Sequence, residues 1–202
     1  MAIKVANNQS LTAITALPSG VSGGAMTLLS TQTASGSSTL SFTSGIDSTY
    51  DEYVFKFYDL NPATDDKKFQ FNLSADGGSN YNVTKTTSFF RAYHDEGDTS
   101  TLLGYGPNGN DLAQGTGVQV FTESAGNGSD ESAAGELHLF APSSTTFVKH
   151  FYSRTSTYYT SDYAFDVFVA GYANTTSAVN AVQFSVESGG NFDGVIKMYG
   201  VS

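Results

Sequence analysis

Cysteine and tryptophan are absent from this chain of 202 residues, and charged residues make up only 14% of it. The lack of cysteine excludes a disulfide scaffold, a thiolate zinc site, an iron–sulfur cluster and a cysteine nucleophile. Basic residues are also scarce, since nine Lys and Arg stand against 19 Asp and Glu and the formal net charge is -10. Because binding to phosphates requires positive charge, we expect no nucleic-acid partner.

Long apolar runs are missing as well. The first ten residues, MAIKVANNQS, contain a lysine and then amides where a signal peptide needs an uninterrupted apolar run. No stretch approaches the roughly 18 consecutive apolar residues of a membrane-spanning helix. We therefore expect a protein without a signal peptide, made in a cytoplasm and not inserted in a membrane.

The chain is instead rich in aromatic residues, with 15 Phe and 12 Tyr, and many of them alternate with polar residues. Phe69, Phe71 and Leu73 share one face of an extended segment, and this alternation is typical of a half-buried strand. The same pattern or a short apolar run predicts further strands at 39–43, 53–58, 87–94, 117–122, 136–141, 146–152, 165–172, 182–186 and 194–201.

Glycine-rich turns separate these segments, at 76–79, 104–109, 126–130 and 188–191. No window of a dozen residues sustains helical spacing. Many short strands between such turns predict an all-β fold, a single jelly-roll-like β-sandwich. The connection at 95–117 carries only weak strand signals, so we expect a surface excursion there, of a length that is uncommon without a role in binding or assembly.

Residues 1–36 differ from the rest because they carry almost no charge and their apolar residues follow no sustained period. One interpretation is an extended N-terminal arm for docking or assembly, which precedes a β-sandwich domain at 37–202. The other is a first strand at about 25–33 with a frayed tail before it. The apolar residues of this arm are Ile14, Leu17, Val21, Met26, Leu28 and Leu29.

Three tyrosines in the polar segment 156–163, STYYTSDY, form a candidate binding site. If this segment is a loop, Tyr158, Tyr159 and Tyr163 present their rings to solvent beside Asp162. Exposed tyrosines of this kind stack on sugars or anchor a protein interface. The alternative is that one or two of the rings fold back against strand edges.

Three carboxylates at 95–98 form a candidate metal site. Asp95, Glu96 and Asp98 offer the hard oxygen ligands that calcium prefers. The alternative is solvated charge on a loop. No close pair of histidines with zinc-ligand spacing is present, and we expect no cofactor other than this calcium.

Several segments resemble small structural proteins of tailed bacteriophages, especially marine ones. The resemblance covers about residues 38–202 as a pattern of similarity rather than as a diagnostic motif. It is carried by 42–58 (FTSGIDSTYDEYVFKFY), 71–81 (FNLSADGGSNY), 143–150 (SSTTFVKH), 171–181 (GYANTTSAVNA) and 191–200 (NFDGVIKMYG).

This resemblance implies a jelly-roll-like sandwich in which the segment 39–43 pairs near 194–201. It also implies a non-enzymatic place on the virion surface, as a capsid decoration, head fibre or tail appendage. The partners expected are other virion proteins of the capsid or tail and further copies of the chain, as a homotrimer. The alternative function is a carbohydrate-binding module of a tail fibre, which recognises host surface glycans.

Overall fold

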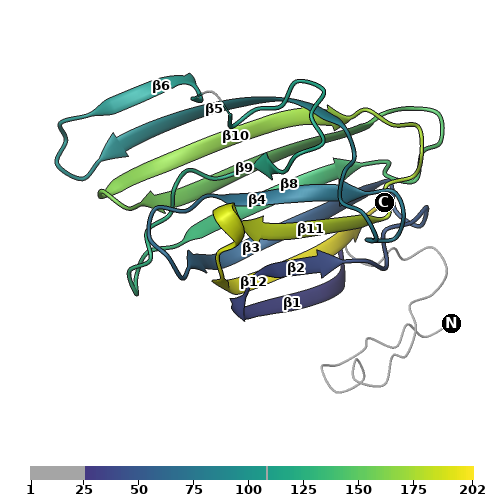
Figure 1. Ribbon diagram of the computed structural model, residues 1–202, viewed down its shortest axis with the longest axis horizontal. Coiled ribbons are helices and arrows are strands. Elements are labelled where there is room, and N and C mark those ends of the chain that lie inside the picture. The colour runs from purple at the N-terminus through teal and green to yellow at the C-terminus, as the bar shows by residue number, and fades with distance from the viewer. Residues whose placement is uncertain (1–25, 108) are drawn as a thin grey trace, which may run out of the picture.

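The computed structural model describes residues 26–107 and 109–202, and in them the chain is almost entirely β. Twelve strands form two antiparallel sheets that pack face to face (Figure 1). The one helical element in the described part of the chain is a short 3-10 turn, η2 (Glu187–Gly189). The expected all-β sandwich is therefore confirmed.

The two sheets are unequal in width. The larger contains eight strands in the order β1 (Thr27–Ser37), β12 (Phe192–Val201), β3 (Glu52–Pro62), β8 (Ala133–Phe140), β9 (Lys149–Tyr159), β10 (Tyr163–Ala173), β5 (Lys85–Asp95) and β6 (Thr101–Tyr105). The smaller contains β2 (Thr39–Phe42), β11 (Ala181–Val186), β4 (Phe69–Ser74) and β7 (Gln119–Val120).

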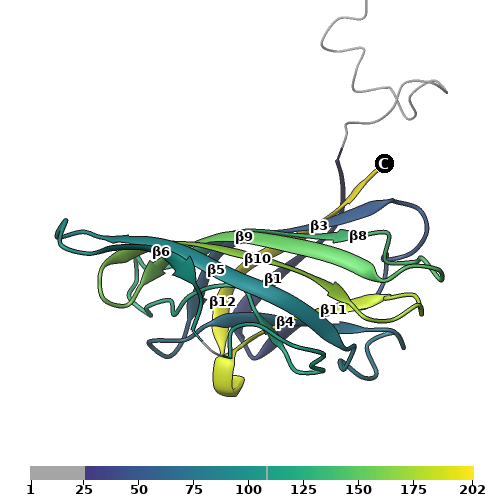
Figure 2. The ribbon, with the colours of Figure 1, turned by 90° about the horizontal axis from the view of Figure 1, so that it is seen from above.

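No two strands of the small sheet follow each other along the chain, so the chain leaves the large sheet and returns to it for each of them. In Figure 2 the small sheet, with β4 and β11, lies along one side of the large sheet. Within the described residues, no further strand or helix packs on the opposite face of the large sheet. The strands β1 and β6 form the two edges of this large sheet and lie far apart in Figure 1.

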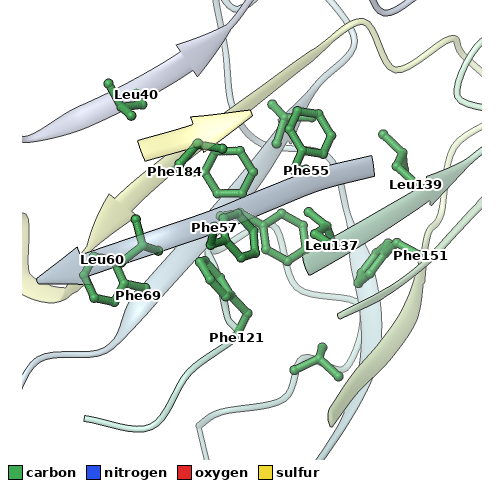
Figure 3. Close-up of a cluster of buried hydrophobic side chains, with 14 of the residues drawn as sticks. Leu40, Phe55, Phe57, Leu60, Phe69, Phe121, Leu137, Leu139, Phe151 and Phe184 are labelled. Carbon is green, nitrogen blue, oxygen red and sulfur yellow. The ribbon is translucent and has the colours of Figure 1, made fainter. Parts of the chain in front are cut away.

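Aromatic rings fill the space between the sheets (Figure 3). Phe184 of β11 lies at the centre, with its ring centroid 5.3 Å from that of Phe57 on β3 and 6.1 Å from that of Phe121. Phe71 of β4 and Phe55 of β3 complete the cluster around it. Phe55 and Phe57 stand at alternate positions of one predicted strand, and Phe71 and Phe184 stand on the apolar faces of two others, so alternation correctly identified the buried side of these strands.

Two of the sequence-based expectations about pairing and loops are wrong. The segment 39–43 pairs with β11 in the small sheet, and the place beside β12 is taken by β1. The connection at 95–117 contains the strand β6, which pairs with β5. The same connection then turns inward, because Asn110 is buried and Gly115 pairs with Lys85.

The boundary predicted at residue 36 falls inside β1. Residues 27–36 belong to the large sheet, as in the interpretation that placed a first strand at about 25–33. The part of the arm at 1–25 lies outside the described residues. The sandwich therefore begins with β1 (Thr27–Ser37), ten residues before the predicted start of the domain at residue 37.

Replacing Phe184 with alanine should lower the free energy of unfolding by about 3–5 kcal/mol, because the side chain is buried among five other rings and leaves a cavity. Denaturant unfolding followed by circular dichroism measures this loss. Phe147→Ala is the matched control, since the ring of Phe147 is 71% exposed and its removal should change stability little. Equal losses for the two variants would contradict this assignment of the core.

Candidate binding groove on the open sheet face

The outer face of the large sheet carries the best candidate for a functional site. Successive side chains of a strand point to opposite faces of the sheet. The residues that alternate with buried ones therefore point to the outer face. On β9 the residues Ser153, Thr155 and Thr157 are buried, whereas Arg154 and Ser156 between them are exposed. The outward residues of neighbouring strands form rows across the sheet, because strand pairing places them side by side.

One such row consists of long side chains from five adjacent strands. Phe90 of β5 pairs with Phe168 of β10, which pairs with Arg154 of β9. The row continues through Glu136 of β8 to Lys56 of β3. This row, Phe90, Phe168, Arg154, Glu136 and Lys56, is called the wall below.

Most side chains beside the wall are short. The next row contains Ala92, Ser156 and Ala134, with Asp166 between Ala92 and Ser156. Asp166 leans toward the wall, because its two carboxylate oxygens accept hydrogen bonds from Arg154 Nε at 3.1 Å and Nη2 at 2.8 Å. The result is an open groove of about 850 Å³ along the wall.

The charges of the wall are held in pairs. Arg154 binds Asp166 through two hydrogen bonds, and this interaction raises the pKa of the guanidinium above its usual value. Lys56 Nζ lies 3.6 Å from Glu136 Oε2. Together with Asp166, the wall is therefore neutral overall, and it presents both hydrogen-bond donors and acceptors to the groove.

The aromatic part of the wall is rigid. The rings of Phe90 and Phe168 are parallel within 2° and their centroids are 4.8 Å apart. The guanidinium carbon of Arg154 lies 4.8 Å from the ring centroid of Phe168. Stacking on the ring of Phe168 therefore orients Arg154 before any ligand binds.

A second hollow of about 360 Å³ extends the groove toward the end of β9. The two hollows share His94, Ala134, Ser156 and Ala164, so they form one continuous depression. The second hollow is bordered in addition by Glu96, Asp130 and Tyr158.

The three candidate tyrosines separate into two environments. They lie at the tip of the hairpin of β9 and β10, which turns at Thr160–Asp162, and not in the open loop expected from the sequence. Tyr159 and Tyr163 face inward and pack against the core, as the alternative interpretation holds. Tyr158 points outward, and of the three only its ring belongs to the outer face.

The hydroxyl of Tyr158 joins the tyrosine site to the acidic segment. It donates to Asp162 Oδ1 at 3.0 Å and lies 3.3 Å from Glu96 Oε1. The hydrogen bond to Asp162, with further contributions from partial desolvation and nearby negative charge, raises the pKa of Tyr158 to about 12. The structure thus brings Tyr158, Asp162 and Glu96 together at one end of the groove.

The three carboxylates of the candidate calcium site have different partners. Asp95 accepts hydrogen bonds from Thr99 and Ser100, which close the turn between β5 and β6 and lower the pKa of Asp95. Glu96 contacts Tyr158, and Asp98 Oδ1 lies 3.0 Å from His94 Nε2. Within 26–107 and 109–202, no three His, Asp or Glu side chains are placed to hold a metal ion together.

The assembly residues are only partly covered by the structure. Ile14, Leu17 and Val21 lie outside the described residues. Met26 and Leu28 are exposed, at 39% and 53%, and Leu29 packs against the core. In the described part of the chain, no helix has the length and apolar character needed to cross a membrane.

The sequence-based prediction missed the wall itself. Lys56, Glu136 and Asp166 each occupy an outward position of a predicted strand, so alternation alone places them in solvent. These residues come together in one site because of strand order and register. The alternation of apolar and polar residues along a strand does not predict either of them.

No family model, no curated protein and no solved structure matches this chain significantly.

The Asp162→Asn variant should lower the pKa of Tyr158 from about 12 toward the ordinary tyrosine value of 10.0, because the charged acceptor of its hydrogen bond is lost. The difference in tyrosinate absorbance between each protein and its Tyr158→Phe counterpart isolates this titration from those of the other tyrosines. Asp166→Asn is the control, because Asp166 binds Arg154 and should leave Tyr158 unchanged. An unchanged pKa in Asp162→Asn would show that this hydrogen bond does not form.

Proposed function

We propose that this chain is a non-enzymatic structural protein on the surface of a tailed bacteriophage particle, docked through its N-terminal arm. Its partners are other virion proteins of the capsid or tail and further copies of itself, assembled as a homotrimer with closed symmetry. The resemblance of residues 38–202 to phage structural proteins supports this function, and so does the position of β1.

The position of β1 is the observation that carries the proposal. This strand of eleven residues contains no charged residue and forms an edge of the large sheet. Edge strands that lack charge are suited to pairing with another chain. Because the exposed Met26 and Leu28 lie at its N-terminal end, a neighbour could gain both backbone hydrogen bonds and apolar contact there.

The groove also fits binding better than catalysis. A general acid requires a carboxyl group whose pKa is raised and which reaches the reacting atom. Beside the groove, the carboxylates of Glu136 and Asp166 are instead paired with Lys56 and Arg154.

Deletion of residues 2–25 should leave a folded domain that joins particles poorly, because β1 and the core remain while the preceding segment is lost. Incorporation is measured by quantifying the protein in particles assembled with each variant. Leu28→Asp should also reduce incorporation, since it places a charge on the exposed apolar end of β1. Leu103→Asp is its matched control, because Leu103 is an exposed leucine on the opposite edge strand, β6.

Two results would contradict this docking role. One is normal incorporation of the truncated protein, and the other is an equal loss for Leu28→Asp and Leu103→Asp. Melting temperatures of all variants separate loss of docking from loss of folding.

The groove favours a second candidate function, a carbohydrate-binding module that recognises host surface glycans. A particle protein can have both roles, since β1 and the groove occupy different parts of the large sheet.

A further inference from the structure

We propose that the groove along the wall binds a neutral, linear oligosaccharide that lies across the strands. This inference rests on the second candidate function, and it assigns the ligand class and the residues that recognise it. The docking role of β1 does not depend on it.

The shape of the groove fits an extended chain. It is lined by residues of β3, β8, β9, β10 and β5, which are adjacent in the large sheet. Five strands at a spacing of about 4.8 Å span about 19 Å. Because the groove is open toward solvent, a polysaccharide can enter it sideways and continue beyond both ends.

The hydrogen-bonding groups of the wall fit hydroxyls. Arg154 carries five N–H donors, and two of them bind Asp166. The carboxylates of Glu136 and Asp166 retain lone pairs beyond those used by Lys56 and Arg154. A sugar hydroxyl both donates and accepts hydrogen bonds. Paired basic and acidic side chains can therefore bind an uncharged sugar.

Aromatic groups border the same groove. Tyr58 of β3 lies at one end, with 38% of its surface exposed, and the ammonium of Lys197 lies 5.2 Å from its ring centroid. Tyr158 borders the second hollow, which extends the groove toward the end of β9. The apolar face of a sugar ring packs on rings of this kind, while its hydroxyls reach the wall.

Charge excludes polyanions as the preferred ligand. Along the groove, Lys56 and Arg154 balance Glu136 and Asp166, and the second hollow adds Glu96 and Asp130. The chain as a whole carries a net charge of -10, which repels nucleic acids and acidic polysaccharides. An extended peptide would add to a sheet edge through its backbone, and the groove lies on the face.

A tryptophan in the groove floor tests the site. Ala164 and Ala170 are both exposed alanines on the outer face of β10, but only Ala164 lines the groove. The full chain and its Ala164→Trp and Ala170→Trp variants are applied to an array of neutral and acidic bacterial polysaccharides, with and without EDTA. Affinities for any polysaccharide that binds are then measured by isothermal titration calorimetry.

We expect the unmodified chain and Ala170→Trp to bind at least one neutral polysaccharide equally, with or without EDTA. Ala164→Trp should bind it at least tenfold more weakly, because the indole fills the groove. Arg154→Ala should also weaken binding at least tenfold, and it tests the same groove if Ala164→Trp does not fold. Particle incorporation of these variants should be normal, so a failure of this inference is distinguishable from a failure of the docking role.

The inference would be overturned by any of four results. These are no binding of neutral polysaccharide by the unmodified chain, equal binding by both tryptophan variants, binding of acidic polymers alone, and loss of binding in EDTA. The last result would place the site at the acidic segment with calcium.

Discussion

The packing of aromatic rings between the two sheets is the constraint on which the rest of this structure depends. Phe184 of the small sheet contacts Phe55 and Phe57 of the large one, and Phe121 closes the cluster. Offset and edge-on contacts between such rings add to the free energy of burial. Because these rings must face the partner sheet, they decide which side of β3 and β11 is inside, and strand pairing transmits that choice to the neighbouring strands.

The outer face follows from this choice. Once Thr155 and Thr157 are inside, Arg154 and Ser156 must point to solvent, and the paired residues of β8 and β10 must do the same. The row of long side chains then forms the wall, and the neighbouring row of short side chains forms the bottom of the groove. The groove is thus a consequence of sheet register, and its depth reflects the alanines and serine that stand beside the wall.

The fold class was predictable because the buried face of most strands is apolar and period-two alternation survives in the sequence. The prediction failed where buried positions are polar. The inward face of β9 carries Ser153, Thr155 and Thr157, and the hydroxyl of Thr155 donates to the carbonyl of Phe121. Ser153 also donates, to the carbonyl of Glu136, so these two hydroxyls are satisfied inside and a strand that extends to Tyr159 resembled a polar loop. The buried Lys85, which donates to Asn72 and to the carbonyl of Val83, gave no apolar signal either.

The sequence by itself determined the strands, the turns between them and the inward side of most strands, because these properties depend on near neighbours along the chain. Only the tertiary structure decided that β1 stands beside β12, that Tyr159 and Tyr163 pack inward, and that residues as distant as Lys56 and Asp166 line one groove. The physical reason is that strand order and register arise from the simultaneous burial of all the rings. Alternation along one strand states which side is buried, but it does not state which strand lies next to it.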